Sequence, residues 1–376
     1  MENKHENSPN NLPSQDKHLI NSKEVYPSKI CDLANPEVWK EHIKEMEDTS
    51  KAKELSRQFF KIKSANDWLT EAKSQKPPKM LFGEFWHTNE LCILFADTNL
   101  GKSILAVQIG NSISKGLAIG NFKLEQEKQQ VLYFDFELTS KQFEIRYSKK
   151  SEDGEYLVDH FNFDTNFNRV EINPDAEIPE GKGFEEHLND SLEKSIVETQ
   201  AKILIIDNIT YLNHENEKAR DVLPMMKKLK ALKSKYDLSL LALAHTPKRD
   251  LSKPITRNDL QGSKMLINFV DSCFTIGESH QDTHLRYLKQ IKARNTEIVY
   301  DSEKVATFQI LKQENFLKFD FIKFTSEGEH LKQITDDDRD KLIEEVKALN
   351  QNGMSQREIA AKLGISLGSV NKYCRL

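Results

Sequence analysis

The sequence predicts an α/β protein with a mostly parallel central sheet covered by helices. Two observations indicate this class. Short apolar runs alternate with longer amphipathic stretches between residues 79 and 300, a pattern typical of parallel strands joined by helices. Distinctive residues also follow two of these runs: a Gly-Lys-Ser triplet stands five residues beyond one run, and an aspartate directly follows the other. A small helical segment is expected before this core, and a three-helix unit after it.

The apolar runs define the expected strands. A later strand-rich stretch, Arg286–Ala293 followed by Phe308–Phe324, has closer spacing, which predicts hairpins added to the same sheet. The strands expected in the core are Leu91–Phe95, Val131–Phe136, Ile203–Ile206, Leu238–Ala244 and Cys273–Ile276.

Composition divides the chain into five expected parts. Residues 1–28 are rich in Asn, Ser, Lys and Pro, which predicts a disordered tail. Residues 29–78 carry apolar side chains at helical spacings and end at a Pro-Pro pair. The α/β domain is expected at 79–326, a polar, acidic linker at 327–339, and the three-helix unit at 340–376.

Overall composition excludes several classes of protein. No apolar run approaches the roughly 20 residues that cross a bilayer, so we expect a cytoplasmic protein with no membrane partner. The four cysteines lie far apart with no Cys-x-x-Cys pair, which indicates neither a disulfide framework nor a zinc site. The formal net charge of −5 means that any contact with DNA must be local.

The Gly-Lys-Ser triplet lies between an expected strand and an apolar helix, which is the context of a phosphate-binding P-loop. Backbone N–H groups of such a loop surround phosphate, Lys102 reaches the β and γ phosphates, and the Ser103 hydroxyl binds Mg²⁺. Its first position is Ala96, where the motif usually has glycine. We therefore expect ATP and Mg²⁺ as cofactors, held by Ala96, Asp97, Thr98, Asn99, Leu100, Gly101, Lys102 and Ser103.

The run Ile203–Ile206 ends in Asp207, the pattern of a strand whose carboxylate holds the magnesium shell. Asp207 and Ser103 are thus the expected metal residues. The alternative is a strand-end aspartate that caps the following turn together with Asn208.

From Phe82 to about Tyr300, the order of elements resembles the RepA-type branch of RecA-like and DnaB-like hexameric ATPases, a group that includes plasmid replicative helicases. The stretch Phe82-Gly83-Glu84-Phe85-Trp86 looks like the start of that family's core. The resemblance covers somewhat over half the chain. It implies a RecA-like core, ATP hydrolysis and a ring of identical subunits, expected to be a hexamer.

The same resemblance assigns catalytic residues. Glu137, just past the strand 131–136, looks like the glutamate that orients the attacking water as a general base. Alternation along the strand places Asp135 on the same face, so Asp135 is the rival, and a solvated or helix-capping Glu137 is a further alternative. His245 ends a strand as the family's sensor of the γ-phosphate does, and the alternative is a structural histidine.

Two groups of cations complete the expected machinery. Lys292 and Arg294 lie two residues apart on a late strand and resemble the paired cations that reach into the neighbouring subunit's ATP site as an arginine finger. The alternative is a solvated basic face. The segment 247–264 corresponds to a loop that contacts single-stranded DNA in RecA-like rings, or is simply a solvated loop; its candidate DNA residues are Lys248, Arg249, Lys253 and Arg257.

The C-terminal residues predict three short helices. Ser355 and Glu358 form a capping box, Gly364 makes a tight turn, and Ser366 caps the third helix. This pattern resembles the helix-turn-helix of resolvases and transposon-encoded regulators, which read double-stranded DNA. The alternative is a helical hairpin for oligomer contacts. The residues expected at DNA are Ser369, Asn371, Lys372 and Arg375.

These features together favour an ATP-hydrolysing, ring-forming DNA motor or remodelling ATPase, helicase-like, that serves replication or transfer of a mobile element. The alternative is an ATP-switched DNA-binding regulator or loader that does not separate strands, because a duplex-reading module is unnecessary on a processive helicase. A recombination mediator that forms filaments is a third hypothesis.

Overall fold

The structure is a computed structural model that describes residues 60–376, except 155–156, 213–221, 248, 261–262 and 334–335. The chain forms two compact units, Met1–Lys76 and Pro77–Leu376. The described part of the first unit contains helix α2 (Ala65–Ala72), whose N-cap Ser64 accepts a hydrogen bond from the Asp67 backbone. The predicted tail and most of the predicted N-terminal helical segment lie outside the described residues.

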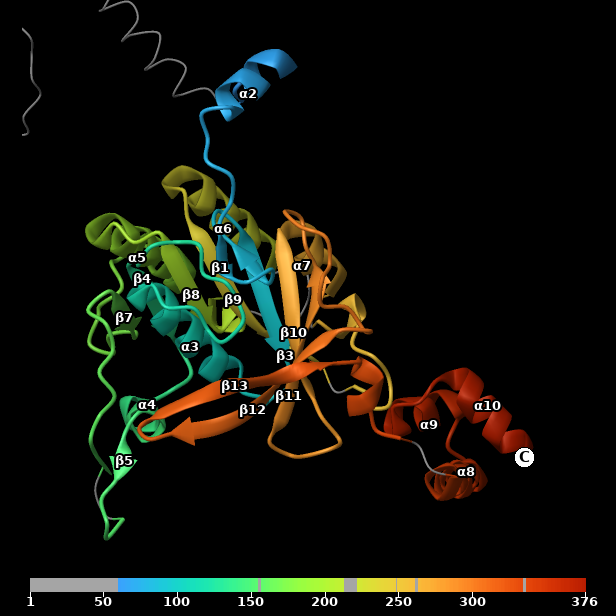
Figure 1. Cartoon of the computed structure of the whole chain (residues 1–376). Helices are drawn as coiled ribbons and strands as arrows, with labels where there is room; N and C mark the ends of the chain where they lie inside the picture. Colours follow the sequence, from blue (N-terminus) through green and yellow to red (C-terminus); the bar gives the residue numbers. More distant parts are fainter. Residues whose placement is uncertain (1–59, 155–156, 213–221, 248, 261–262, 334–335) are drawn as a thin grey trace, which may run out of the picture. The chain divides into compact units, whose positions relative to one another are not determined.

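The second unit is built on a nine-stranded sheet with the order β13-β12-β11-β10-β3-β9-β8-β4-β7 (Figure 1). From β10 to β7 every neighbouring pair is parallel, whereas β11, β12 and β13 are added antiparallel. The α/β class with a mostly parallel sheet is therefore confirmed. The strands are β3 (Leu91–Ala96), β4 (Val131–Asp135), β7 (Phe167–Val170), β8 (Ile203–Asp207), β9 (Ser239–His245), β10 (Ser272–Glu278), β11 (Leu285–Lys292), β12 (Val305–Gln313) and β13 (Phe316–Thr325).

Edge strand β7 is the part of the sheet that the sequence did not reveal. It pairs with β4 on one side, and after Phe167 its residues are only partly buried. Two of its four residues, Asn168 and Arg169, are polar, so no apolar run marks it. Two small antiparallel pairs accompany the main sheet: β1 (Met80–Phe82) with β2 (Trp86–His87), and β5 (Lys149–Lys150) with β6 (Leu157–Val158).

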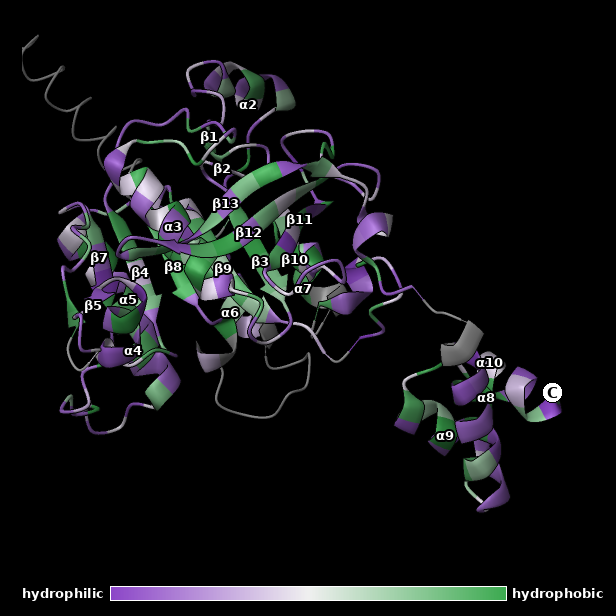
Figure 2. Ribbon diagram, turned by 60° about the horizontal axis from the view of Figure 1, so that its bottom comes forward, coloured by the Kyte–Doolittle hydropathy of each residue, from purple (hydrophilic) through white to green (hydrophobic). Residues whose placement is uncertain are grey.

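Helices cover both faces of the parallel strands. Along β3, Cys92 and Leu94 pack with α3 on one face, while Leu91 and Ile93 belong to the core formed with α5, α6 and α7 on the other. Figure 2 shows the hydrophobic residues concentrated on these strands and on the helix sides that meet them. The helices are α3 (Lys102–Lys115), α4 (Ser140–Arg146), α5 (Phe184–Thr199), α6 (Val222–Tyr236) and α7 (Ser263–Phe269).

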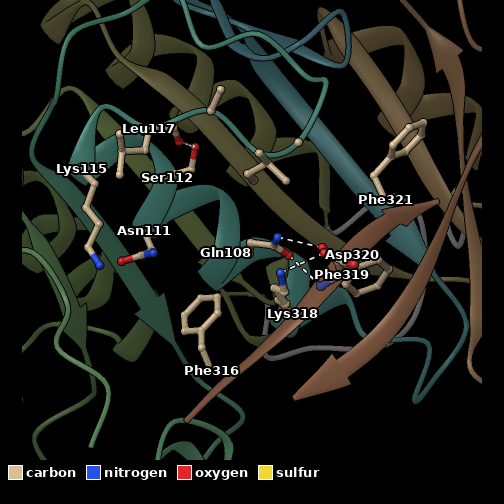
Figure 3. Close-up of a pocket in the computed structure, with 13 residues that line it drawn as sticks. Gln108, Asn111, Ser112, Lys115, Leu117, Phe316, Lys318, Phe319, Asp320 and Phe321 are labelled. Atoms are coloured by element: carbon tan, nitrogen blue, oxygen red, sulfur yellow. Dashed lines mark hydrogen bonds and ion pairs between the residues drawn. The ribbon is translucent and has the colours of Figure 1, made fainter. Parts of the chain in front are cut away.

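The hairpin of β12 and β13 packs on helix α3. The Gln108 side chain donates to the Phe319 carbonyl at 2.9 Å and accepts from the Phe319 amide at 2.8 Å (Figure 3). A cavity of about 290 Å³ lies beside this contact, between α3 and β13. At the start of α3, a Cβ on Gly101 would come within 2.9 Å of the Phe319 ring, and its φ is +94°. Glycine at this position lets the hairpin approach the P-loop closely.

The first residues of the predicted linker pack into the α/β domain. They form the 3-10 turn η4 (Glu327–His330), in which both end residues are buried. Glu327 forms a 2.5 Å ion pair with Lys289 of β11 and accepts a hydrogen bond from the Ile255 amide at 2.7 Å. The predicted linker range is therefore partly structured, because a buried cation on a distant strand compensates the Glu327 charge.

Three C-terminal helices follow: α8 (Asp336–Gln351), α9 (Gln356–Leu363) and α10 (Leu367–Arg375). Their core consists of Val346, Ile359 and Val370. The predicted caps are present, with a capping box at Ser355 and a left-handed Gly364 at the end of α9. Helix α8 begins before the predicted boundary. None of the helices within the described residues combines the length and apolar character needed to span a bilayer.

Candidate nucleotide site

The P-loop follows β3 and leads into α3, as predicted. Asn99 (φ +64°) and Gly101 (φ +94°) adopt left-handed backbone, which turns the chain sharply before the helix. The Lys102 ammonium donates to the carbonyls of Ala96 and Asp97, both at 2.9 Å. Thr98 and Asn99 are exposed and Leu100 is buried. The loop thus closes around the lysine.

Burial lowers the pKa of the Lys102 ammonium, and nearby carboxylates, chiefly Glu137 and Asp207, oppose this shift. Lys102, Glu137 and Asp207 are therefore electrostatic neighbours, although they come from three separate segments. This shared location is what a nucleotide site requires, because phosphate oxygens, a metal ion and an attacking water must meet in one place.

Asp207 ends β8 and is fully buried. The Tyr133 hydroxyl donates to its Oδ2 at 2.7 Å, whereas Oδ1 has no partner of suitable distance and angle among the described residues. Burial raises the pKa of Asp207 to about 6, against the lowering effect of the Ser103 and Tyr133 hydroxyls. A buried carboxylate oxygen without a partner, beside a serine hydroxyl, fits Mg²⁺, which prefers oxygen ligands and carries the compensating charge.

The Asp207→Asn variant is expected to be more stable than the natural protein in EDTA at pH 8. An acid with a folded pKa of about 6 and an ordinary value of 3.8 keeps its proton in the folded state where the unfolded chain has lost it. Its contribution to stability therefore falls as pH rises from about 4 to 6, and the ionised form costs about 3 kcal/mol above that window. Asparagine does not titrate, so the stability difference should shrink towards pH 4.

Urea unfolding curves at pH 4, 6 and 8 measure this difference. Asp190→Asn removes an exposed carboxylate on α5 and serves as the control, with little change expected. Equal stability of Asp207→Asn and the natural protein at pH 8 would show that burial of this charge is already compensated without a metal. Addition of Mg²⁺ and nucleotide should stabilise only the natural protein.

Glu137 lies just past β4, where its carboxylate meets two side chains. Its Oε1 lies 3.3 Å from His245 Nε2 at the end of β9 and contacts the Asn208 side-chain amide. The hydrogen bond with His245 is the main reason that the pKa of Glu137 lies below its ordinary value. A carboxylate that remains ionised at neutral pH can accept a proton from water, as a general base must.

Asp135 has different partners from Glu137. It is buried in an ion pair with Arg169 of β7 at 2.8 Å, and its Oδ1 accepts hydrogen bonds from the Glu137 and Leu138 amides. The strand ends at Asp135, so the expected alternation does not extend to Glu137 and the two carboxylates meet different partners. This geometry favours Glu137 as the base and makes Asp135 a support for the turn that presents it.

Three further residues contact the carboxylates of this site; sequence patterns gave no role to two of them and named Asn208 only in the alternative of a turn cap. Tyr133 donates to Asp207, Arg169 neutralises Asp135, and Asn208 contacts Glu137. Tyr133 stands two residues before Asp135, so strand alternation could have placed it on the same face. Arg169 had no such signal, because its edge strand carries no apolar run. The peptide bond between Asp207 and Asn208 is cis.

Lys292 and Arg294 lie beside the start of β3, whereas the P-loop follows the end of β3. Lys292 pairs with Cys273 near the start of β10 and donates to the Ile267 carbonyl at 2.6 Å. Arg294, past the end of β11, forms a 2.7 Å ion pair with Asp271, which also accepts from the amide of Leu91 at the start of β3. The six residues of β3 span about 17 Å. Neither cation therefore lies beside the P-loop of its own chain.

The predicted DNA loop is anchored within its length. Ile255 and Leu260 are buried on either side of a short 3-10 turn, η3 (Arg257–Asp259). Arg257 and Lys253 are exposed, and Lys253 forms an ion pair with Asp250 at 2.9 Å. Arg249 is half-buried and donates to the Lys253 carbonyl. Lys248 lies outside the described residues.

The candidate DNA residues at the C-terminus lie on α10. Lys372 and Arg375 are exposed, whereas Asn371 and Ser369 are half-buried. The Ser369 hydroxyl is hydrogen-bonded to that of the N-cap Ser366 at 2.8 Å. Lys372 and Arg375 are thus accessible to solvent, and their role at DNA stays a prediction.

Comparison with known families gives the core its identity. The family described as AAA domain matches residues 57–250, just over half of the 376 residues. The chain belongs to this family. The matched residues of this AAA domain protein include the P-loop, Glu137, Asp207 and His245. The chain is therefore a P-loop ATPase that binds ATP with Mg²⁺. Lys292, Arg294 and the C-terminal helices follow the matched part.

No curated protein sequence matches the chain. Among solved structures, the AAA domain protein is similar to the crystal structure of a KaiC-like protein from the hyperthermophilic archaeon Pyrococcus horikoshii OT3. The identity is 14%, the TM-score is 0.41, and the match covers 62% of this chain and 90% of the other.

Proposed function

We propose that this protein is an ATP-hydrolysing, ring-forming DNA motor or remodelling ATPase that acts in replication or transfer of a mobile element. The observation that carries the proposal is the convergence of Lys102, Asp207 and Glu137 at the carboxyl ends of the parallel strands. When bound, Mg²⁺ would neutralise the phosphates. The chain's own residues hold phosphate at Lys102, hold the metal at Asp207 and Ser103, and orient water at Glu137.

The position of Lys292 and Arg294 supports an assembly of subunits. Arg294 has a half-exposed side chain and lies beside the start of β3, whereas its own P-loop follows the end of that strand. A guanidinium that stabilises the transferred phosphoryl group must approach it closely. Arg294 would therefore act on the P-loop of an adjacent subunit, as a closed ring provides.

Replacement of Arg294 by alanine is expected to lower ATP turnover at least about 100-fold while the oligomer persists. The matched control is Lys233→Ala, which removes the other cation on Asp271 and should leave turnover nearly unchanged. Mixing Arg294→Ala with Lys102→Ala subunits should restore part of the activity, because mixed interfaces combine an intact P-loop with an intact arginine. Full activity of Arg294→Ala alone would exclude the finger.

DNA is the proposed partner at two places. The exposed cations Lys253 and Arg257 would add a salt-sensitive contact with single-stranded DNA. Helix α10 would read duplex DNA through Asn371 and Lys372. The second candidate function is an ATP-switched regulator or loader, and the three-helix unit favours it, because that unit suits a chosen duplex site better than continuous movement.

Two measurements test the proposed function. Native mass measurement with and without ATP and single-stranded DNA separates a ring from a filament or a monomer. A forked-duplex assay then separates a motor from a regulator, since only a motor displaces a strand while it hydrolyses ATP. Hydrolysis without DNA binding in either assay would reject both DNA roles and leave the P-loop ATPase.

A further inference from the structure

Asn208 lies between the expected base and the expected sensor. It follows Asp207 directly and is buried at the end of β8. Its Nδ2 contacts Glu137 Oε1 and lies 3.1 Å from His245 Nε2. The third side of this triangle, from Nε2 to Oε1, is 3.3 Å. Three polar atoms from three strand ends thus meet in one contact.

The number of protons shows that these three contacts cannot all be hydrogen bonds at once. An amide nitrogen only donates, an ionised carboxylate only accepts, and a histidine nitrogen does one or the other. If Nε2 carries a proton, His245 and Asn208 both donate to Glu137, and their own contact sets two donors face to face. If Nε2 lacks the proton, Asn208 donates to both partners, and His245 loses its bond to Glu137.

The contact from Asn208 to Glu137 is favourable in both protonation states. Reversing the amide would place Asn208 Oδ1 against the Glu137 carboxylate, which would repel it. His245 Nδ1 is buried and has no partner among the described residues, so it supplies no competing restraint on the ring. Asn208 is therefore the donor on which the orientation of Glu137 depends whatever the state of His245.

We propose that Asn208 is a positioning residue for ATP hydrolysis: its amide fixes the Glu137 carboxylate and, through it, the contact with His245. The inference rests on the ATP hydrolysis in the proposed function, with Glu137 as the base. The Glu137 side chain is 37% exposed, so packing alone does not select one of its rotamers. A buried amide held at a strand end can select one, and a base displaced by an ångström loses much of its effect.

Two substitutions separate positioning from a purely structural role. Asn208→Ala is expected to lower kcat about 10- to 100-fold, the effect of one hydrogen bond to a charged group, with ATP affinity changed less than about threefold. Asn208→Asp keeps the shape but replaces the donor by a second carboxylate facing Glu137. The fall in kcat for Asn208→Asp should equal or exceed the fall for Asn208→Ala. A structural role predicts the opposite order, because the isosteric aspartate would pack better than alanine.

A double-mutant cycle adds a second measurement. In a Glu137→Gln background, Asn208→Ala should cause little further loss of single-turnover rate, because it acts through that carboxylate. Asn173→Ala, in the exposed segment after β7, is the control and should behave as the natural protein. Thermal melting shows whether each variant folds.

The outcomes are distinct. Near-normal turnover by Asn208→Asp, or fully additive losses in the cycle, would overturn the positioning role while the proposed function stands. A natural protein that binds ATP without hydrolysing it would overturn both. Hydrolysis without a ring or DNA would overturn the DNA motor and leave the role of Asn208 intact.

Discussion

Replacing Lys102 by alanine is expected to abolish ATP hydrolysis, with a fall in kcat/KM of at least about 100-fold. The ammonium is the cation that the P-loop brings to the phosphates, and it stands in the field of the Asp207 and Glu137 carboxylates. Without it, these negative charges face the triphosphate with less compensation. The measurement is steady-state phosphate release together with binding of a fluorescent ATP analogue.

The Lys102 variant also tests a structural role of the same side chain. The ammonium donates to the Ala96 and Asp97 carbonyls, so alanine leaves both without this partner. Lys115→Ala, at the other end of α3, removes a lysine of the same helix outside the loop and is the matched control. Unchanged turnover in a folded Lys102→Ala protein would contradict the assignment of the nucleotide site. If Lys102→Ala does not fold, the same measurement is made on Lys102→Arg, which keeps the positive charge but changes the position of the cationic group.

The second large effect is expected from Glu137→Gln, which should bind ATP but hydrolyse it about 100- to 10,000-fold more slowly. Glutamine keeps the size of the side chain and removes the basic oxygen that accepts a proton from water. Loss of the negative charge beside the phosphates should leave ATP affinity equal or slightly higher. Single-turnover hydrolysis measures the chemical step, and equilibrium binding measures affinity.

Asp135→Asn is the informative comparison for Glu137, because Asp135 is the neighbouring carboxylate. Its ion pair with Arg169 predicts a lower melting temperature, with a smaller loss of turnover than Glu137→Gln. If Asp135→Asn abolished hydrolysis while Glu137→Gln remained active, the two roles would have to be exchanged.

Local patterns in the sequence predicted most of the core. Each of the five expected core strands is present, and its ends differ from the prediction by at most one residue, except at the carboxyl end of β10. The P-loop, the strand that ends in Asp207 and the caps of α9 and α10 were also visible, because each depends on residues close together in the chain. Strand β7 and the buried turn at Glu327 were not visible, because their burial depends on distant partners.

The chain's own sequence determined the class of fold and the chemical groups of the nucleotide site, since apolar periodicity and a phosphate-binding loop are properties of short segments. The tertiary structure alone decided which groups meet. Tyr133 and Asp207 are 74 residues apart, and Glu137 and His245 are 108 apart. Their contacts follow from the order of strands in the sheet. The antiparallel direction of β11 sets Arg294 beside the start of β3, away from the P-loop at its end. Strand order and direction both depend on packing of the whole domain, which local sequence patterns do not encode.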